Sequence, residues 1–165
     1  MATGETLITL SPLQASFPSS NPATPDLRNA HPVLDFDTTT QEIVYFDNLI
    51  MPRHYAGGNI VVYVHHAASS ATTGTIGWDV TLERISDSQQ DIDSDGFATA
   101  KTITAATVPG TSGHVAIVNV TLTAGATDTD SVAVGEAFRI RLRRDVSNDT
   151  ATGDAEFFAM ELKEA

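Results

Sequence analysis

The clearest pattern in the chain is an alternation of apolar and polar positions with a period of two. It is sharpest over residues 75–85, where Ile76, Trp78, Val80 and Leu82 alternate with Gly, Asp, Thr and Glu. Successive side chains of a strand point to opposite faces, so this spacing predicts a strand with one apolar face directed at a core. No stretch of comparable length shows the 3.6-residue spacing of an amphipathic helix.

Further segments have strand character and are separated by Gly, Pro and Asp. They are residues 33–37, 42–51, 59–66, 97–108, 114–123, 137–145 and 155–163. About eight strands with this punctuation predict an all-β fold, a two-sheet antiparallel sandwich with jelly-roll-like or immunoglobulin-like topology. The length of 165 residues fits one domain, and the order of the strands is left open.

The beginning of the chain differs from the rest. Residues 11–32 hold five of the seven prolines, and proline cannot donate to a strand ladder. We therefore expect residues 1–32 to form an extended N-terminal arm and residues 33–165 to form the sandwich domain. An arm that packs back onto its own domain is an equal alternative. The arm is the expected attachment element for a partner, with candidate contact residues Leu7, Leu10, Pro12, Phe17, Pro22 and Pro25.

Charge and composition narrow the range of partners. Nine basic residues against 21 acidic ones give a formal net charge of −12, which disfavours binding to nucleic-acid phosphates. The apolar runs are far shorter than the ~20 residues of a spanning helix, so we expect no membrane partner. The N-terminus does not show the pattern of a secretory signal. The absence of cysteine excludes disulfides and thiolate chemistry.

One loop resembles half of a calcium site. Asp91, Asp93 and Asp95 alternate before Gly96, as carboxylates do in the first half of a calcium-binding loop. The twelfth position of that pattern is Thr102 instead of Glu. The three aspartates are therefore candidate calcium ligands, and an ordinary turn is the competing interpretation. No other cofactor is expected.

A row of arginines is the second unusual feature. Arg139, Arg141 and Arg143 share one face of a predicted strand in a very acidic protein. They either pair with acids on a neighbouring strand, such as Asp79 and Glu83, or form a docking stripe for an acidic partner. The pairing interpretation is favoured, and the docking stripe stays open.

The sequence gives no sign of catalysis. The histidines lack the spacing of metal ligands, and adjacent His65 and His66 face opposite sides of a strand. No Gly-x-Ser-x-Gly nucleophile elbow is present. We expect the chain not to be an enzyme.

Several turn phrases resemble those of small virion proteins from tailed phages. They are Met51-Pro52-Arg53-His54-Tyr55-Ala56-Gly57-Gly58, Val108-Pro109-Gly110-Thr111-Ser112-Gly113 and Phe138-Arg139-Ile140-Arg141-Leu142. In layout, the chain resembles phage capsid decoration (cement) proteins. That resemblance implies a structural protein, made in the host cytoplasm, that binds the virion's outer capsid surface. It implies the major capsid protein and copies of the chain itself, as a trimer, as partners. The alternative is a tail- or spike-associated β-sandwich module that binds a carbohydrate receptor, and a small hydrolase ranks last.

Overall fold

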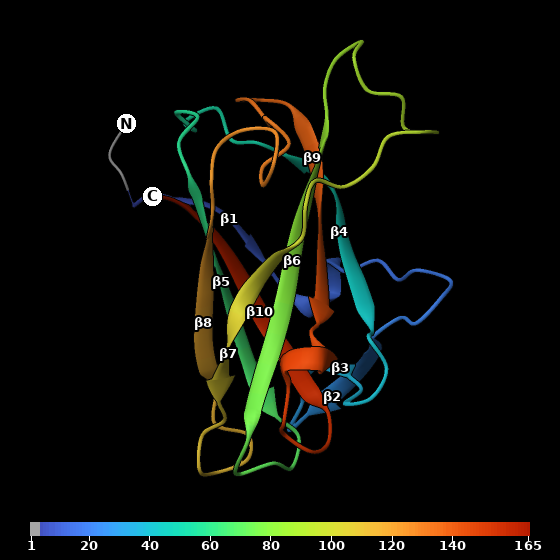
Figure 1. Ribbon diagram of the computed structural model, residues 1–165, viewed down its shortest axis with the longest axis vertical. Helices are drawn as coiled ribbons and strands as arrows, with labels where there is room; N and C mark the ends of the chain where they lie inside the picture. The colour runs from blue at the N-terminus through green and yellow to red at the C-terminus, as the bar shows by residue number, and fades with distance from the viewer. Residues whose placement is uncertain (1–3) are drawn as a thin grey trace.

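The computed structural model describes residues 4–165, which form two antiparallel sheets packed face to face (Figure 1). The six-stranded sheet contains β2 (Thr24–Arg28), β3 (His31–Phe36), β10 (Ala155–Glu164), β5 (Ile60–Ala68) and β8 (Ala116–Leu122) in that order, with β1 (Thr6–Leu10) also paired to β10. The four-stranded sheet has the order β4 (Ile43–Ile50), β9 (Ala137–Arg144), β6 (Thr75–Ile85) and β7 (Lys101–Thr107). Two short 3-10 turns, η1 (Pro12–Gln14) and η2 (Val146–Asn148), complete the structure. The predicted all-β sandwich is confirmed.

The core lies between the sheets and is built by the alternation seen in the sequence. In β6, the side chains of Ile76, Trp78, Val80 and Leu82 are almost completely buried. Trp78 meets Phe36 of β3 edge to face, with ring centroids 5.0 Å apart, so the two sheets are joined by an aromatic contact. All eight strands predicted from the sequence are present, and β6 has the predicted bounds.

The expectation that residues 1–32 form an arm outside the core is wrong for residues 4–32. Strand β1 pairs with β10, β2 pairs with β3, and Leu7 and Leu10 are buried in the same core as the rest of the domain. The segment therefore folds back onto its own domain, as the alternative had it. Residues 1–3 lie outside the described residues.

The prolines are compatible with this arrangement because of where they stand. Pro12 is the first residue of η1, where no backbone donor is required. Pro25 lies on β2, the edge strand of the six-stranded sheet, where one side of the strand has no partner. Proline thus limits this segment to edge and turn positions without excluding it from the sheet. Within residues 4–165, no helix is long and apolar enough to cross a membrane.

Candidate functional site

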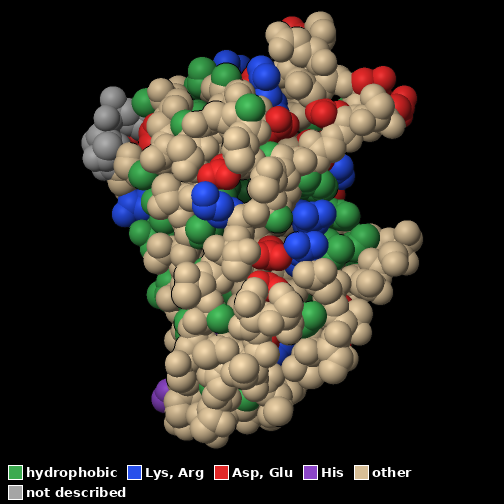
Figure 2. All heavy atoms as spheres, in the orientation of Figure 1, with side chains coloured by type: hydrophobic (Ala, Val, Ile, Leu, Met, Phe, Trp, Pro, Cys, Tyr) green, Lys and Arg blue, Asp and Glu red, His purple; other side chains and the backbone are tan. Residues whose placement is uncertain are grey.

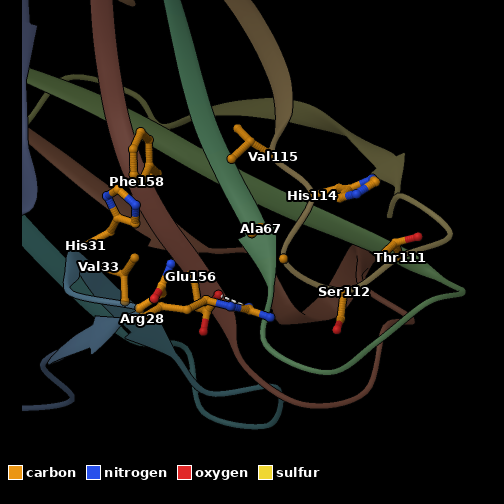
Figure 3. A pocket seen from close by; sticks show the side chains of 12 residues that line it. Arg28, His31, Val33, Ala67, Thr111, Ser112, His114, Val115, Glu156 and Phe158 are labelled. Atoms are coloured by element: carbon orange, nitrogen blue, oxygen red, sulfur yellow. Dashed lines mark hydrogen bonds and ion pairs between the residues drawn. The ribbon is translucent and has the colours of Figure 1, made fainter.

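A pocket of about 510 Å³ lies on the outer face of the six-stranded sheet (Figure 3). The turn between β2 and β3 forms one side, and residues 111–115, between β7 and β8, form the other. The floor comes from the first half of β10 and the end of β5, with Glu156 and Ala67. Four segments that are distant in the sequence therefore meet around one opening.

One wall of the pocket is aromatic because β10 is irregular at this point. The pairing of β10 with β5 shifts between Phe157 and Ala159, so a bulge is formed at Phe158. Phe157 is completely buried in the core, while Phe158 is 38% exposed and faces outward. The imidazole of His31 on β3 meets the Phe158 ring edge to face at 6.1 Å. The bulge therefore places a large apolar ring at the surface.

Next to the aromatic side chains, the pocket contains an ion pair. Arg28, at the end of β2, pairs with Glu156 on β10, and its Nη1 also donates to the carbonyl oxygen of Ala68 at 2.9 Å. The Glu156 side chain is only 7% exposed. Figure 3 shows the two side chains side by side below the aromatic wall. The ion pair therefore places a guanidinium donor and a carboxylate acceptor side by side at the pocket.

The position of the Arg28 guanidinium requires that residue 113 has no side chain. Gly113 has a φ of +82°, and a Cβ added there would lie 2.7 Å from Arg28 Nη2. The Gly113 amide donates to the Ala68 carbonyl oxygen at 3.2 Å, the same acceptor that Arg28 uses. A side chain at this position would displace the Arg28 guanidinium, so the ion pair with Glu156 depends on glycine at residue 113.

Acidic side chains lie next to the pocket on β3 and the following loop. Burial, followed by the charge of Glu156, raises the pKa of Asp35 to about 6. Asp35, Asp37, Glu42 and Asp154 line a smaller recess of about 200 Å³. Hydrogen bonds from Thr39 and Thr40 lower the pKa of Asp37, so the pKa values of Asp35 and Asp37 are shifted in opposite directions.

The structure does not bring the predicted calcium ligands together. Asp91, Asp93 and Asp95 lie in the loop between β6 and β7, where Asp91 Oδ1 accepts a hydrogen bond from the Asp93 amide at 3.0 Å. In the part of the chain that the structure describes, no group of three His, Asp or Glu side chains is placed to hold a metal ion. The carboxylate of Asp91 serves the turn itself, which is the ordinary role of such residues.

The arginine row pairs across strands, as the favoured interpretation had it. Arg139 Nε donates to Glu83 at 2.6 Å, and Arg143 Nη2 donates to Asp79 at 2.8 Å. Arg141 lies between them and forms no ion pair with a described residue. A docking role for the three arginines stays a prediction.

The predicted contact residues of the N-terminal segment fall into two groups. Leu7, Leu10 and Pro12 are buried within their own domain, so in this conformation they are not available to a partner. Phe17, Pro22 and Pro25 are exposed, and their role as contacts stays a prediction. The sequence analysis did not identify Phe158 as a site residue. The adjacent pair Phe157-Phe158 was a signal, because neighbouring residues of a strand cannot both face the core.

The comparisons with known proteins support the fold. No protein family and no curated protein matches the chain by sequence. Among solved structures, it is similar to the C-terminal CBM6 of LamC, a marine laminarinase from Zobellia galactanivorans, with a TM-score of 0.52 and 10% identity over 97% of this chain and 100% of that one. It is also similar to the CBM22-1–GH10 modules of xylanase 10B from Clostridium thermocellum, solved with xylohexaose, with a TM-score of 0.52 and 8% identity over 98% of this chain and 29% of that one. A third match is a glycosylation-associated protein (Gap123) complex from Streptococcus agalactiae, with a TM-score of 0.50 and 9% identity over 99% of this chain and 26% of that one. The chain therefore has the β-sandwich fold that is also found in carbohydrate-binding modules.

Proposed function

We propose that this protein is a carbohydrate-binding β-sandwich module without catalytic activity, and that the pocket beside Phe158 holds the glycan. The observation that carries the proposal is the combination of an exposed ring with the Arg28–Glu156 pair in one opening. The fold shared with two carbohydrate-binding modules supports it.

The chemistry of the pocket suits a sugar. A pyranose ring has an apolar face of C–H groups and a rim of hydroxyls, and the ring of Phe158 matches the first of these. Neighbouring hydroxyls can both donate and accept, which matches the planar guanidinium and carboxylate of the ion pair. A concave site with apolar lining and a few fixed polar groups is the usual form of a small-ligand site.

The same pair favours binding over catalysis. Glu156 is held by Arg28 at the floor of the pocket, and it is the one acidic residue among the described residues that line it. Most glycoside hydrolases use a pair of carboxyl groups that flank the bond they cleave. We therefore assign Glu156 to hydrogen bonding with the ligand.

The test compares two phenylalanines of similar exposure. Phe158 is 38% exposed in the pocket, and Phe17 is 42% exposed outside it. On a glycan array followed by calorimetry, Phe158→Ala should weaken binding by about tenfold or more, and Phe17→Ala should leave it unchanged. EDTA should have no effect, because Asp91, Asp93 and Asp95 do not converge. Equal affinity of the two variants would refute the pocket assignment.

Capsid decoration is the second candidate, and one observation favours it. In the N-terminal segment, Leu13 and Leu27 are 81% and 65% exposed and line one recess together with Pro12 and Pro25, and Phe17 is 42% exposed. Apolar side chains that gather in this way are typical of a binding surface. On this proposal, the protein sits on the virion as a homo-oligomer, with a trimer expected, and contacts the major capsid protein. A particle-binding assay separates the two functions, because Phe17→Ala should then impair binding and Phe158→Ala should not.

A further inference from the structure

The outer face of the four-stranded sheet, opposite the pocket, carries a group of arginines. Arg139, Arg141 and Arg143 of β9 lie beside Glu83, Thr81 and Asp79 of β6, in register. Figure 2 shows Lys and Arg side chains midway down this face, beside the notch between two projecting segments. These basic side chains stand out on a protein whose net charge is −12.

Two of the three arginines are already neutralised. The carboxylates of Glu83 and Asp79 are 3% and 8% exposed, and they hold Arg139 and Arg143. Arg141 faces Thr81 instead of an acid, and it has no ion pair with any residue from 4 to 165. Asp47 lies 3.9 Å from Arg139 as a second carboxylate, so the row holds as many carboxylates as guanidiniums, and Arg141 is the arginine without a direct partner among them.

The aromatic ring of Phe97 lies over this unpaired arginine and over its neighbour Arg139. The ring of Phe97 stacks on Tyr45 at 5.7 Å, and the guanidinium carbon of Arg141 lies 5.1 Å from the Phe97 centroid. The Ala98 amide donates to the Leu82 carbonyl oxygen at 2.9 Å, which fixes the loop that carries Phe97. Burial, followed by the charge of Arg143, lowers the pKa of Arg141. A partly buried guanidinium without a direct partner attracts an anion more strongly than a guanidinium at an open surface does.

We propose that Arg141 anchors a second ligand site, which takes a single carboxylate group carried by a sugar, as in a uronic acid. A guanidinium binds a carboxylate through two parallel hydrogen bonds, and one free guanidinium accommodates one such group. A polyanion is disfavoured because the remaining surface is strongly acidic.

The polar atoms around Arg141 favour a sugar acid over a simple anion. The side chains of Arg139 and Arg143, on either side of Arg141, are 32% and 24% exposed. A sugar acid supplies hydroxyl oxygens as well as a carboxylate, so its hydroxyls can accept hydrogen bonds from these two guanidinium groups. Acetate supplies only the carboxylate. The site lies on the sheet opposite the Phe158 pocket, so this proposal can be correct whether or not the Phe158 pocket binds a glycan.

The test uses titration calorimetry with galacturonic acid, which carries one carboxylate, and with galactose and acetate as the matched ligands. The full-length protein should bind galacturonic acid, and it should bind acetate at least tenfold more weakly. Arg141→Gln should reduce affinity for galacturonic acid by about tenfold or more and leave any binding of galactose unchanged, and Arg141→Lys should lose part of the affinity, because an ammonium cannot form the bidentate pair. Arg53→Gln is the control, since Arg53 is exposed and its guanidinium lies against Gly135, outside the row.

Each possible result either supports the proposal or contradicts it. Loss in Arg141→Gln with retained binding in Arg53→Gln and Phe158→Ala supports the proposal. No binding of galacturonic acid to the unmodified protein, or equal loss in Arg141→Gln and Arg53→Gln, overturns it. Equal affinity for acetate overturns the assignment to a sugar acid. Thermal melting of each variant verifies that the fold is intact.

Discussion

The imidazole of His66 is buried at the centre of the sandwich, and this makes the fold sensitive to acid. His66 lies on β5, is 1% exposed and meets Trp78 with ring centroids 5.5 Å apart. Neither ring nitrogen has a hydrogen-bond partner within residues 4–165. Burial, followed by the charges of Arg144 and His65, lowers the pKa of His66 to about 4 from the ordinary 6.5.

The sign and size of the effect follow from this shift. A lowered pKa means that the unfolded chain takes up a proton between pH 6.5 and 4 that the folded chain does not. His66 therefore destabilises the fold as the pH falls through this window, and the effect is absent above 6.5. One pKa unit corresponds to about 1.4 kcal/mol, so the loss approaches about 3 kcal/mol at pH 4.

Asp35 acts in the opposite direction in nearly the same window. Its pKa is raised to about 6, so the folded chain holds a proton there that the unfolded chain has lost, and acidification through this range stabilises the fold. Because Asp35 is partly exposed, its contribution is smaller than that of His66. The net result expected is a decline in stability below pH 6.5 that is less steep than His66 alone would give.

Urea unfolding between pH 4 and 8 measures the effect, with far-UV circular dichroism as the signal. In His66→Leu, the titrating group is removed and the volume is roughly kept, so the decline should largely disappear and stability at low pH should exceed that of the unmodified protein. In Asp35→Asn, the decline should become steeper. A His66→Leu variant with an unchanged pH profile would refute the reasoning.

Three further outcomes are expected. Leu10→Ala should lower the free energy of unfolding by about 2–5 kcal/mol in denaturant titrations, and Leu13→Ala by about 0.5 kcal/mol or less, because Leu10 is 2% and Leu13 is 81% exposed; equal effects would mean that β1 is not part of the core. Asp149→Asn should destabilise the fold by about 3–5 kcal/mol, since it leaves the Arg144 guanidinium, 0% exposed, without its counter-charge. The same assay should show about 1 kcal/mol or less for Glu136→Gln, whose pair with Arg84 is partly exposed. Gly113→Ala should weaken glycan binding in calorimetry because it displaces Arg28, whereas Gly110→Ala should not, as a Cβ at Gly110 meets nothing within 4 Å.

Much of the fold was predictable because it depends on local alternation. The period of two in β6 and β9 fixes which side chains enter the core, and both strands form as expected. The N-terminal segment was not predictable in the same way. Its prolines argue against an interior strand, and the sequence does not reveal that β2 lies at a sheet edge, where proline is tolerated.

The candidate sites depended on contacts that no local pattern encodes. Arg28, Gly113 and Glu156 are far apart in the chain, and they meet because β2, β10 and the loop before β8 converge. The exposure of Phe158 depends on a bulge in the pairing of β10 with β5, which is a property of two strands and not of one. In the arginine row, the sequence placed three cations on one face, but only the register against β6 decided that Arg141 faces Thr81 and has no acid opposite it.

The sequence by itself determined the layers of this protein, since alternation of apolar and polar residues specifies strands and the face that each one buries. The tertiary structure decided which strands are neighbours and at which sheet edges proline is tolerated. It also decided which polar side chains have a hydrogen-bond or ion-pair partner and which do not. Those outcomes depend on register and on contacts over long sequence separations, and side-chain chemistry becomes a binding surface only after such contacts have formed.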